Sequence, residues 1–304
     1  MLSICIPTYN RAAYIAEAID SVLSQDCDDY EIVIVDDGST DNTAEAVAPC
    51  LSDRVRYVQK EHSGAPATRN RAIREARGEF IVWLDSDDAL EPGVLSAYAR
   101  VMAEFPDADV VYGDIAVADE RMHKSGKVFR YQDWYGRREE LIGRLFQEDP
   151  VPNGGTAIRR AAFERVGMYD ETFRRAHDYE WYSRAAQHLT FKYAGIPVLT
   201  WRWHGGNMSS GSVKIDYRFD VRIVMAMLER YPLWQLFPEV DWDKQSVRDA
   251  EALAYIRAAL RLVGLNARQE AAELLQQSYD RVPSERTMQL RRQLLGEDAE
   301  PVQA

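Results

Sequence analysis

Two patterns of hydrophobic residues alternate along the first 114 residues. Short continuous apolar runs, typical of buried strands, are separated by segments in which apolar residues recur every three or four positions, as on one face of a helix. The predicted strands cover residues 2–7, 30–35, 55–59, 80–84 and 110–112. The predicted helices cover 15–23, 44–51, 67–76 and a segment opened by Pro92. This order indicates βαβ units, and therefore an α/β fold whose sheet is mostly parallel and flanked by helices.

The pattern changes twice beyond residue 114. Segment 115–212 is irregular, and its polar stretch 119–127 is either a hairpin or a mobile loop. Short strands are predicted there at 156–159, 191–194 and 198–203, and helices at 138–146 and 178–187. Segment 213–304 carries helical patterns at 219–231, 247–262, 267–279 and 285–295. We therefore divide the chain into 1–114, 115–212 and a helical C-terminal extension over 213–304.

Composition excludes several classes of protein. With 46% hydrophobic and 28% charged residues over 304 positions, the chain has a globular balance, not a disordered or collagen-like one. Lys and Arg number 37 against 49 Asp and Glu, so the formal net charge is −12. Such a chain has no general affinity for nucleic acid or for an anionic lipid surface, so an anionic substrate needs a local binding device.

Cysteines and apolar runs indicate the compartment. Cys5, Cys27 and Cys50 are odd in number and show no metal-ligand spacing, which favours a reducing compartment over a disulfide framework or a zinc site. The chain enters an apolar run at Leu2 without a basic leader, and no apolar run approaches the roughly 20 residues of a transmembrane helix. We expect a cytoplasmic protein, either free or peripheral at the inner face of the membrane.

Polar residues cluster directly after the predicted strands. In open α/β sheets, ligands bind in the crevice beyond the carboxyl ends of the strands, so these residues are candidates for a site. They are Pro7 to Arg11 after the first strand, Asp36 to Ser39 after the second, His62 to Gly64 after the third and Asp85 to Asp88 after the fourth. The edge where these strands end is therefore the predicted site.

The run Asp85-Ser86-Asp87-Asp88 is the most informative of these clusters. Three carboxylates within four residues repel one another unless a cation lies among them. Oxygen ligands in that number favour a hard divalent ion, Mn²⁺ or Mg²⁺, which keeps coordination sites open for substrate phosphates. The alternative is a solvated acidic turn in which Asp88 caps the next helix.

Asp36, Asp37 and Arg69 give weaker signals. A carboxylate at a strand end can accept a hydrogen bond from a nucleobase or a ribose, but Asp36 and Asp37 also fit an ordinary strand–turn–helix junction. Arg69 follows the small residues 64–67 and can bind a phosphate through its forked guanidinium. Its alternative is an ordinary helical arginine, paired with Glu75 or left in solvent.

Four runs of sequence together resemble the family 2 glycosyltransferases, which have the GT-A fold. The resemblance covers residues 1 to about 210 and rests on the order and spacing of residues 3–11, 34–41, 64–70 and 84–88. It implies a nucleotide-sugar donor, a divalent metal ion and transfer with inversion at the anomeric carbon. Segment 1–114 would then bind the nucleotide sugar, and segment 115–212 would bind the acceptor.

The resemblance also implies roles for individual residues. Those that would bind the nucleotide are Pro7, Thr8, Tyr9, Asn10, Asp36, Asp37, Arg69, Asp85 and Ser86. Asp37 would bond the base and Asp85 would face the ribose. Asp87, the second aspartate of an Asp-x-Asp motif, would ligate the metal that bridges the diphosphate, and a cation there stabilises the charge on the leaving group. UDP is the nucleotide that the resemblance favours, while dTDP and GDP stay open.

An inverting displacement also needs a carboxylate that takes the proton of the acceptor hydroxyl. By resemblance this base is Asp178, although the residue before it, commonly Glu in the family, is His177 here. Glu180 is an alternative base. Asp178 also fits the role of a helix N-cap without catalytic function.

The last assignments concern a histidine, two glycines and a tryptophan. His204 resembles the histidine of the family's late Tyr-Arg-x-His segment, so it is a candidate ligand for metal or phosphate, with a structural role as the alternative. Gly154, Gly155 and Trp181 are assigned to the acceptor region, where an aromatic ring can stack on a sugar. The acceptor would be a glycan, a lipid-linked oligosaccharide or another hydroxyl compound, as in surface polysaccharide or glycoconjugate synthesis.

Other functions explain part of the pattern. A nucleotidyltransferase normally carries a Gly-rich phosphate loop after the first strand, and the sequence has no such loop there. A phosphohydrolase needs an aspartyl nucleophile with a Lys and a Thr at strand ends, and the sequence does not indicate this set either. The alternative is a non-catalytic nucleotide-sugar or glycan-binding module, which the presence of both Asp87 and Asp178 disfavours. Apolar stripes on the C-terminal helices predict packing on the catalytic domain or a homodimer.

Overall fold

The computed structural model describes residues 1–207 and 216–297 of the chain. Two compact units divide these residues: the first comprises 1–138 and 149–207, and the second comprises 139–148 and 216–297. Every residue that the sequence predicts for the site belongs to the first unit.

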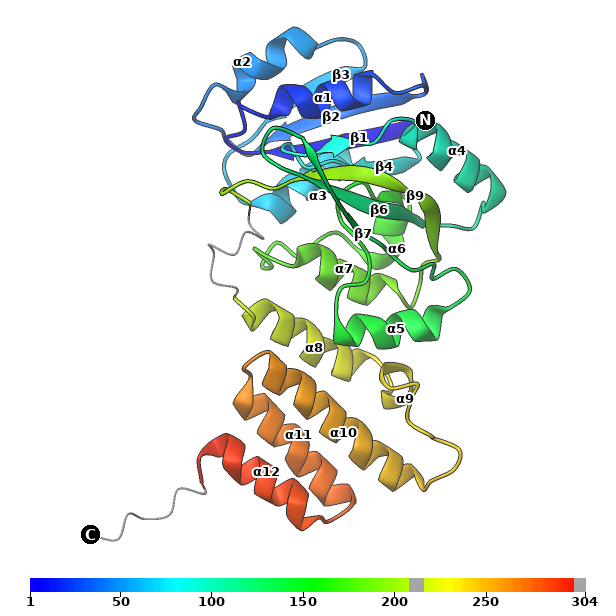
Figure 1. The fold of residues 1–304 in the computed structure, drawn as a ribbon, viewed down its shortest axis with the longest axis vertical. Coiled ribbons are helices and arrows are strands. Elements are labelled where there is room, and N and C mark those ends of the chain that lie inside the picture. The colour runs from blue at the N-terminus through cyan, green and yellow to red at the C-terminus, as the bar shows by residue number, and fades with distance from the viewer. Residues whose placement is uncertain (208–215, 298–304) are drawn as a thin grey trace, which may run out of the picture. The chain divides into compact units, whose positions relative to one another are not determined.

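The first unit is built on a mixed sheet (Figure 1). Its described strands are β1 (Leu2–Thr8), β2 (Tyr30–Asp36), β3 (Val55–Gln59), β4 (Phe80–Trp83), β5 (Ala89–Leu90), β6 (Val110–Ala118), β7 (Lys124–Phe129), β8 (Ala157–Arg159) and β9 (Phe191–Arg202). Their order across the sheet is β3-β2-β1-β4-β8-β6-β9-β5, and β7 pairs with β6. The apolar runs of β2 and β4 are buried along their whole length, as expected for strands covered on both faces.

The strands that carry the predicted site are parallel to one another. β3, β2, β1 and β4 are paired in parallel, and so are β6 and β9, whereas β8 runs antiparallel between β4 and β6. Parallel strands end at one edge, and the register accordingly places Thr8 opposite Asp36. The α/β class with a mostly parallel, helix-flanked sheet is confirmed.

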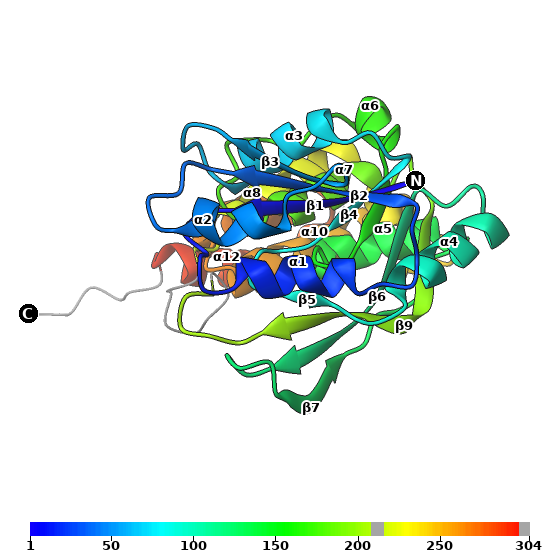
Figure 2. The same ribbon diagram turned by 90° about the horizontal axis from the view of Figure 1, so that it is seen from above.

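Helices cover both faces of the parallel strands (Figure 2). Those of the first unit are α1 (Ile15–Leu23), α2 (Thr43–Val47), α3 (Ala65–Glu75), α4 (Val94–Glu104), α6 (Ala162–Val166) and α7 (His177–Ala185). α1 and α4 share a core with Ile4 and Ile6 of β1. α3 lies on the opposite face, where the Cys5 thiol donates to the Ala72 carbonyl. Because both faces are occupied, the carboxyl edge is the part of these strands that remains for a ligand.

The middle of the first unit differs from the sequence pattern. One strand, β9, replaces the two short strands predicted at 191–194 and 198–203. Gly195 and Pro197 indicate a break, but the β6–β9 pairing shifts register near Asp114 and so accommodates a proline that has no N–H to donate. The polar stretch 119–127 forms the turn and the start of β7 in the β6–β7 hairpin, one of the two alternatives.

The second unit is helical. Its described helices are α5 (Arg138–Gln147, of which all but Arg138 belong here), α8 (Arg218–Arg230), α9 (Leu233–Leu236), α10 (Val247–Gly264), α11 (Arg268–Arg281) and α12 (Glu285–Leu295). Ser246 and Ser284 cap α10 and α12, since their hydroxyls accept backbone N–H groups of the first turn. Among the residues described, no helix is both long enough and apolar enough to cross a membrane.

Candidate active site

The loops after β1 and β2 are fastened to each other. Asn10 donates its N–H to the Ser39 hydroxyl (2.8 Å), and its side-chain oxygen accepts from the Thr40 N–H (2.8 Å). The Arg11 N–H donates to the Thr43 hydroxyl (2.9 Å). Asn10 has φ 52°, a left-handed conformation that asparagine tolerates better than most residues. Asn10 therefore shapes the edge where a nucleotide is predicted to bind.

Asp36 is engaged on both carboxylate oxygens within the protein. One oxygen accepts from the Ser39 N–H (2.8 Å), and the other accepts from the Tyr57 hydroxyl. Burial, with this hydrogen bond, raises the pKa of the Tyr57 phenol. The side chain of Asp36 thus holds the end of β2 and the turn that follows it.

Asp37 is held by the loop after β3. Its carboxylate accepts from the Ser63 N–H (2.9 Å) and the Gly64 N–H (2.8 Å), and it pairs with the Lys60 ammonium. Burial acts to raise the pKa of Asp37, but these three donors outweigh it and hold that pKa below its usual value. Asp37 is therefore an ionised carboxylate at a fixed position on the edge.

An aromatic surface lies next to Asp37. Tyr9 is 40% exposed, and the centroid of its ring is 4.4 Å from that of His62. The Nδ1 atom of His62 is 2.9 Å from an Asp37 oxygen. Within the described residues, the buried Thr8 hydroxyl, which follows Pro7, has no hydrogen-bond partner. The exposed ring of Tyr9 offers a face on which a nucleobase can stack, next to the loop that Asp37 fixes.

Asp85 and Arg69 form a pair above the ring of Trp83. The Arg69 guanidinium contacts an Asp85 oxygen, and its carbon lies 4.7 Å from the centroid of the Trp83 ring. Desolvation raises the pKa of Asp85, as does the charge of Asp87, although Arg69 opposes both. Glu75, the alternative partner of Arg69, accepts instead from Arg71 (2.7 Å). The reading of Arg69 as a helical arginine paired with Glu75 is therefore wrong.

Asp88 points inward, and Ser86 is also buried. An oxygen of Asp88 accepts from the Arg202 N–H (2.9 Å), while the Arg202 Nε donates to the Asp87 carbonyl (2.7 Å). Burial, followed by the charges of Asp85 and Asp87, raises the pKa of Asp88 well above its usual value. The next helix, α4, has Gly93 at its N-cap, so Asp88 does not cap it.

Asp87 and His204 meet across the edge. The Nε2 atom of His204 is 3.1 Å from Asp87 Oδ2, and the Nε atom of Arg11 is also 3.1 Å from that oxygen. The buried His204 ring stacks on Tyr14, with ring centroids 4.9 Å apart. The Gly206 N–H donates to His204 Nδ1 (3.1 Å), so the neutral ring carries its proton on Nε2 and donates it to Asp87.

The pair Asp87 and His204 fits a divalent metal. Among residues 1–207 and 216–297, no group of three or more His, Cys, Asp or Glu side chains is arranged to hold an ion. Mg²⁺ and similar ions are commonly held by one or two protein carboxylates, with substrate phosphates and water completing the shell. A carboxylate with a neutral imidazole is a suitable donor set for Mn²⁺. Metal binding through Nε2 requires the Gly206 N–H to release Nδ1.

Asp178 lies in the first turn of α7 and belongs to the same cluster of charges. Its carboxylate is half-buried and acts electrostatically on Arg69 and Asp85. The N-cap of α7 is Ala176, at φ 56°, and Asp178 lies two residues further on. The reading of Asp178 as the N-cap is therefore wrong.

The neighbours of Asp178 have structural surroundings. His177 is buried against Tyr169, with ring centroids 5.6 Å apart, and burial lowers the pKa of His177 to about 4 although Asp178 opposes this. Glu180 binds Arg184 through both oxygens (2.6 and 3.0 Å), and Arg184 also donates to main-chain carbonyls of the preceding loop. Glu180 thus fastens α7 to that loop.

The three residues assigned to the acceptor region lie in the interior. Trp181 is fully buried, and its Nε1 donates to the Gly167 carbonyl (2.8 Å). A Cβ atom on Gly154 would lie 2.7 Å from a methyl of Leu199, so this glycine lets the loop pass close beneath β9. Gly155 is similarly placed, close to Val198 of β9.

Gly155→Ala should destabilise the first unit by about 1–3 kcal/mol. Gly155 has φ 75°, and a Cβ there would lie 2.8 Å from a methyl of Val198. Denaturant unfolding measures the effect. Gly126→Ala is the matched control, because Gly126 has φ 80° but a Cβ there meets no described atom within 4 Å. Equal losses in the two variants would contradict the packing role.

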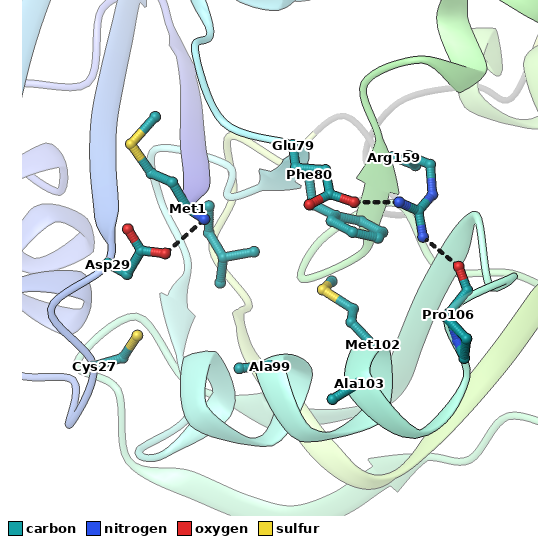
Figure 3. A pocket seen from close by; sticks show the side chains of 11 residues that line it. Met1, Cys27, Asp29, Glu79, Phe80, Ala99, Met102, Ala103, Pro106 and Arg159 are labelled. Atoms are coloured by element: carbon teal, nitrogen blue, oxygen red, sulfur yellow. Dashed lines mark hydrogen bonds and ion pairs between the residues drawn. The ribbon is translucent and has the colours of Figure 1, made fainter.

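A pocket of about 320 Å³ lies at the opposite edge of the sheet (Figure 3). Met1 and Phe80, at the amino ends of β1 and β4, line it, and Arg159 contacts Glu79 and donates to the Pro106 carbonyl (2.8 Å) at its side. None of the predicted site residues lines this pocket. It is separate from the candidate active site.

The sequence pattern includes Arg11 in the polar run after the first strand, but it assigns no role to the side chains of Arg11, Lys60 or Arg202. Each of these residues lies at or just beyond the end of a strand, and this position is the feature of the sequence that could have indicated them as site residues. Their partners, Asp37 and the 85–88 turn, lie 23 to 115 residues away in sequence, so no local pattern reveals the contacts.

Comparisons of sequence agree on one family. Residues 3–167 match the protein family described as "Glycosyl transferase family 2". A protein of Rickettsia typhi named an uncharacterized glycosyltransferase is 32% identical over 183 residues, which is 59% of this chain but only 57% of that protein. A "PGL/p-HBAD biosynthesis glycosyltransferase" of Mycobacterium tuberculosis is 29% identical over 246 residues, 76% of this chain and 91% of that one.

Solved structures share the fold. Residues 1–349 of TarS from S. aureus, in complex with UDP-GlcNAc, have a TM-score of 0.63 at 20% identity, over 97% of this chain and 86% of that TarS chain. The mannosyltransferase PcManGT of Pyrobaculum calidifontis, in complex with GDP-Man and Mn²⁺, has a TM-score of 0.52 at 21% identity, over 97% of this chain and 84% of that one. With the GT-A fold and a family match over more than half of its length, the chain belongs to glycosyltransferase family 2.

Proposed function

We propose that this chain is a metal-dependent inverting glycosyltransferase that moves a sugar from a nucleoside-diphosphate donor, UDP in the simplest case, to a hydroxyl of a glycan, lipid-linked or other acceptor. One arrangement carries the proposal. The Asp87–His204 pair, the Asp85–Arg69 pair and the carboxylate of Asp178 lie at one carboxyl edge. This edge combines a cation site, a buried arginine that pairs with a carboxylate, and a base.

The nucleotide is proposed to lie along the loops after β1, β2 and β3. Its base would stack on the Tyr9–His62 surface and bond to the edge that Asp37 forms. The diphosphate would extend toward Asp87, past Arg69. UDP-GlcNAc in TarS and GDP-Man in PcManGT support a nucleotide-sugar donor, and the first supports UDP.

Mn²⁺ or Mg²⁺ is proposed to bind Asp87 and His204. When bound, such an ion stabilises the negative charge that develops on the departing diphosphate. Arg69 remains on Asp85 and reduces the repulsion between that carboxylate and the diphosphate. The Mn²⁺ in the PcManGT complex supports a divalent ion here.

Asp178 is proposed to accept the proton of the acceptor hydroxyl. The acceptor oxygen bonds to the anomeric carbon as the carbon–diphosphate bond breaks on the opposite face, so the configuration inverts, and the proton passes to Asp178. Glu180 is the weaker candidate because both of its oxygens bind Arg184.

The acceptor is proposed to bind to segment 115–212, of which 208–212 lie outside the described residues. Trp203 is 44% exposed and adjoins His204, so its ring is better placed than the buried Trp181 to contact a sugar. Surface polysaccharide or glycoconjugate synthesis is the proposed context. A homodimer through the C-terminal helices and a place at the inner face of the membrane stay predictions.

A panel of nucleotide sugars tests the activity. In the presence of Mn²⁺, one donor should release its nucleoside diphosphate at a rate at least about tenfold above that in EDTA. Release is measured by a coupled nucleotide assay, and the anomeric configuration of the product by NMR. Donor binding without turnover would favour a binding module, and metal-independent release would contradict the metal role.

A further inference from the structure

The three carboxylates of the 85–88 turn are each matched with one arginine. Arg69 pairs with Asp85, Arg11 pairs with Asp87 (3.1 Å), and Arg202 binds Asp88 through its main-chain N–H (2.9 Å) while its charge also acts on that group. Arginines of the protein therefore offset part of the negative charge of the turn, although mutual repulsion still contributes to the raised pKa values of Asp85 and Asp88.

The three arginines differ in how firmly they are held. The side chains of Arg69 and Arg202 are 4% and 2% exposed, whereas that of Arg11 is 27% exposed. Arg202 also contacts Glu17 and donates to two main-chain carbonyls. Apart from its contact with Asp87, the Arg11 side chain donates to one main-chain carbonyl, that of the adjacent Asn10 (3.2 Å), and its backbone N–H donates to the Thr43 hydroxyl (2.9 Å). Of the three, Arg11 is the arginine whose side chain can exchange partners.

Arg11 also lies where it competes with a metal. Its Nε and the Nε2 of His204 are both 3.1 Å from the same Asp87 oxygen, Oδ2. A divalent ion held by Asp87 and His204 and the guanidinium of Arg11 would both be positively charged and would therefore repel each other. An ion that binds the Oδ2 atom of Asp87 therefore competes with the Arg11 guanidinium for that oxygen.

We infer that Arg11 is the counter-ion of Asp87 until a metal ion binds. The ion then displaces the Arg11 guanidinium from Asp87, and the guanidinium binds the diphosphate of the donor. This inference rests on the proposed function. The diphosphate supplies the anionic partner that Arg11 loses at Asp87, and a guanidinium forks well to phosphate. Metal and nucleotide therefore bind cooperatively. The ion alone binds weakly, because it breaks the Arg11–Asp87 pair while no diphosphate is present to become the new partner of Arg11.

Calorimetric titration of the full chain with MnCl₂, alone and in the presence of UDP, tests this role. Arg11→Gln removes the competing charge, so it should bind Mn²⁺ alone at least about fivefold more tightly than the wild type. UDP should strengthen Mn²⁺ binding in the wild type and do so less in the variant, because the partner for the diphosphate is lost. Arg54→Gln, which removes one charge at a 52% exposed site paired with Asp28, should leave both affinities unchanged.

Two results would overturn the inference. The first is a folded Arg11→Gln protein that binds Mn²⁺ alone no better than the wild type, as expected if Arg11 only ties the loop. The second is an Arg11→Lys protein, which keeps the positive charge, that binds Mn²⁺ alone as tightly as Gln does. If the wild type failed to bind Mn²⁺ in the presence of UDP, of GDP and of dTDP, the proposed function itself would be contradicted. Failure of the Arg11 inference alone is distinguished from this result, because the wild type would then still bind Mn²⁺ with a nucleotide.

Discussion

Asp87→Asn should lower kcat/KM for glycosyl transfer by about 100- to 1,000-fold. The amide keeps the shape of the side chain but removes the charge that draws a divalent ion beside His204. Steady-state kinetics over a range of Mn²⁺ concentrations measure the loss, and the variant should need much more Mn²⁺ for half-maximal rate.

Asp88→Asn is the matched control for that substitution. Asp88 is one residue away, but it is buried and its pKa is raised, and an amide oxygen can still accept from the Arg202 N–H. We expect a small effect on kcat/KM and no change in the Mn²⁺ requirement. If Asp88→Asn proved as damaging as Asp87→Asn, the metal would not be specific to Asp87.

Asp178→Asn should lower kcat by about 100- to 10,000-fold while leaving the affinity for the nucleoside diphosphate nearly unchanged. The substitution removes the group proposed to take the acceptor's proton and leaves the nucleotide edge around Asp37 intact. Single-turnover transfer measures the chemical step, and calorimetry with UDP and Mn²⁺ measures binding.

Glu180→Gln is the comparison that separates the two candidate bases. Loss of the charge that binds Arg184 should lower the stability of the first unit, but the folded enzyme should keep most of its turnover. Retained turnover in Asp178→Asn together with its loss in folded Glu180→Gln would transfer the role of base to Glu180.

Local periodicity is enough to predict the fold. The elements around the site are continuous apolar runs or stretches with a 3.6-residue repeat, and α1 (Ile15–Leu23) and β3 (Val55–Gln59) have the predicted bounds. The carboxyl edge follows from the alternation of strands and helices, because parallel strands end together. β6 (Val110–Ala118) extends beyond its predicted end at residue 112, and β9 (Phe191–Arg202) is continuous, because the two strands pair with each other although they lie far apart in the sequence.

The contacts at the edge depend on tertiary structure. Nothing near Asp37 in the sequence predicts that Lys60, Ser63 and Gly64 bind it, and nothing near Asp87 predicts Arg11. An aromatic residue in a helical pattern is more often part of the core than a surface for stacking a sugar, and the pattern alone does not separate the two. The buried environment of Trp181 becomes known only once α7 is packed.

The measurement that tests the central claim most directly is anomalous diffraction from crystals that contain Mn²⁺ and the nucleoside diphosphate. The claim predicts one manganese peak in ligand contact with the Asp87 carboxylate and the diphosphate, with the base beside Tyr9 and Asp37. A manganese ion or a nucleotide bound away from Asp87 would contradict it.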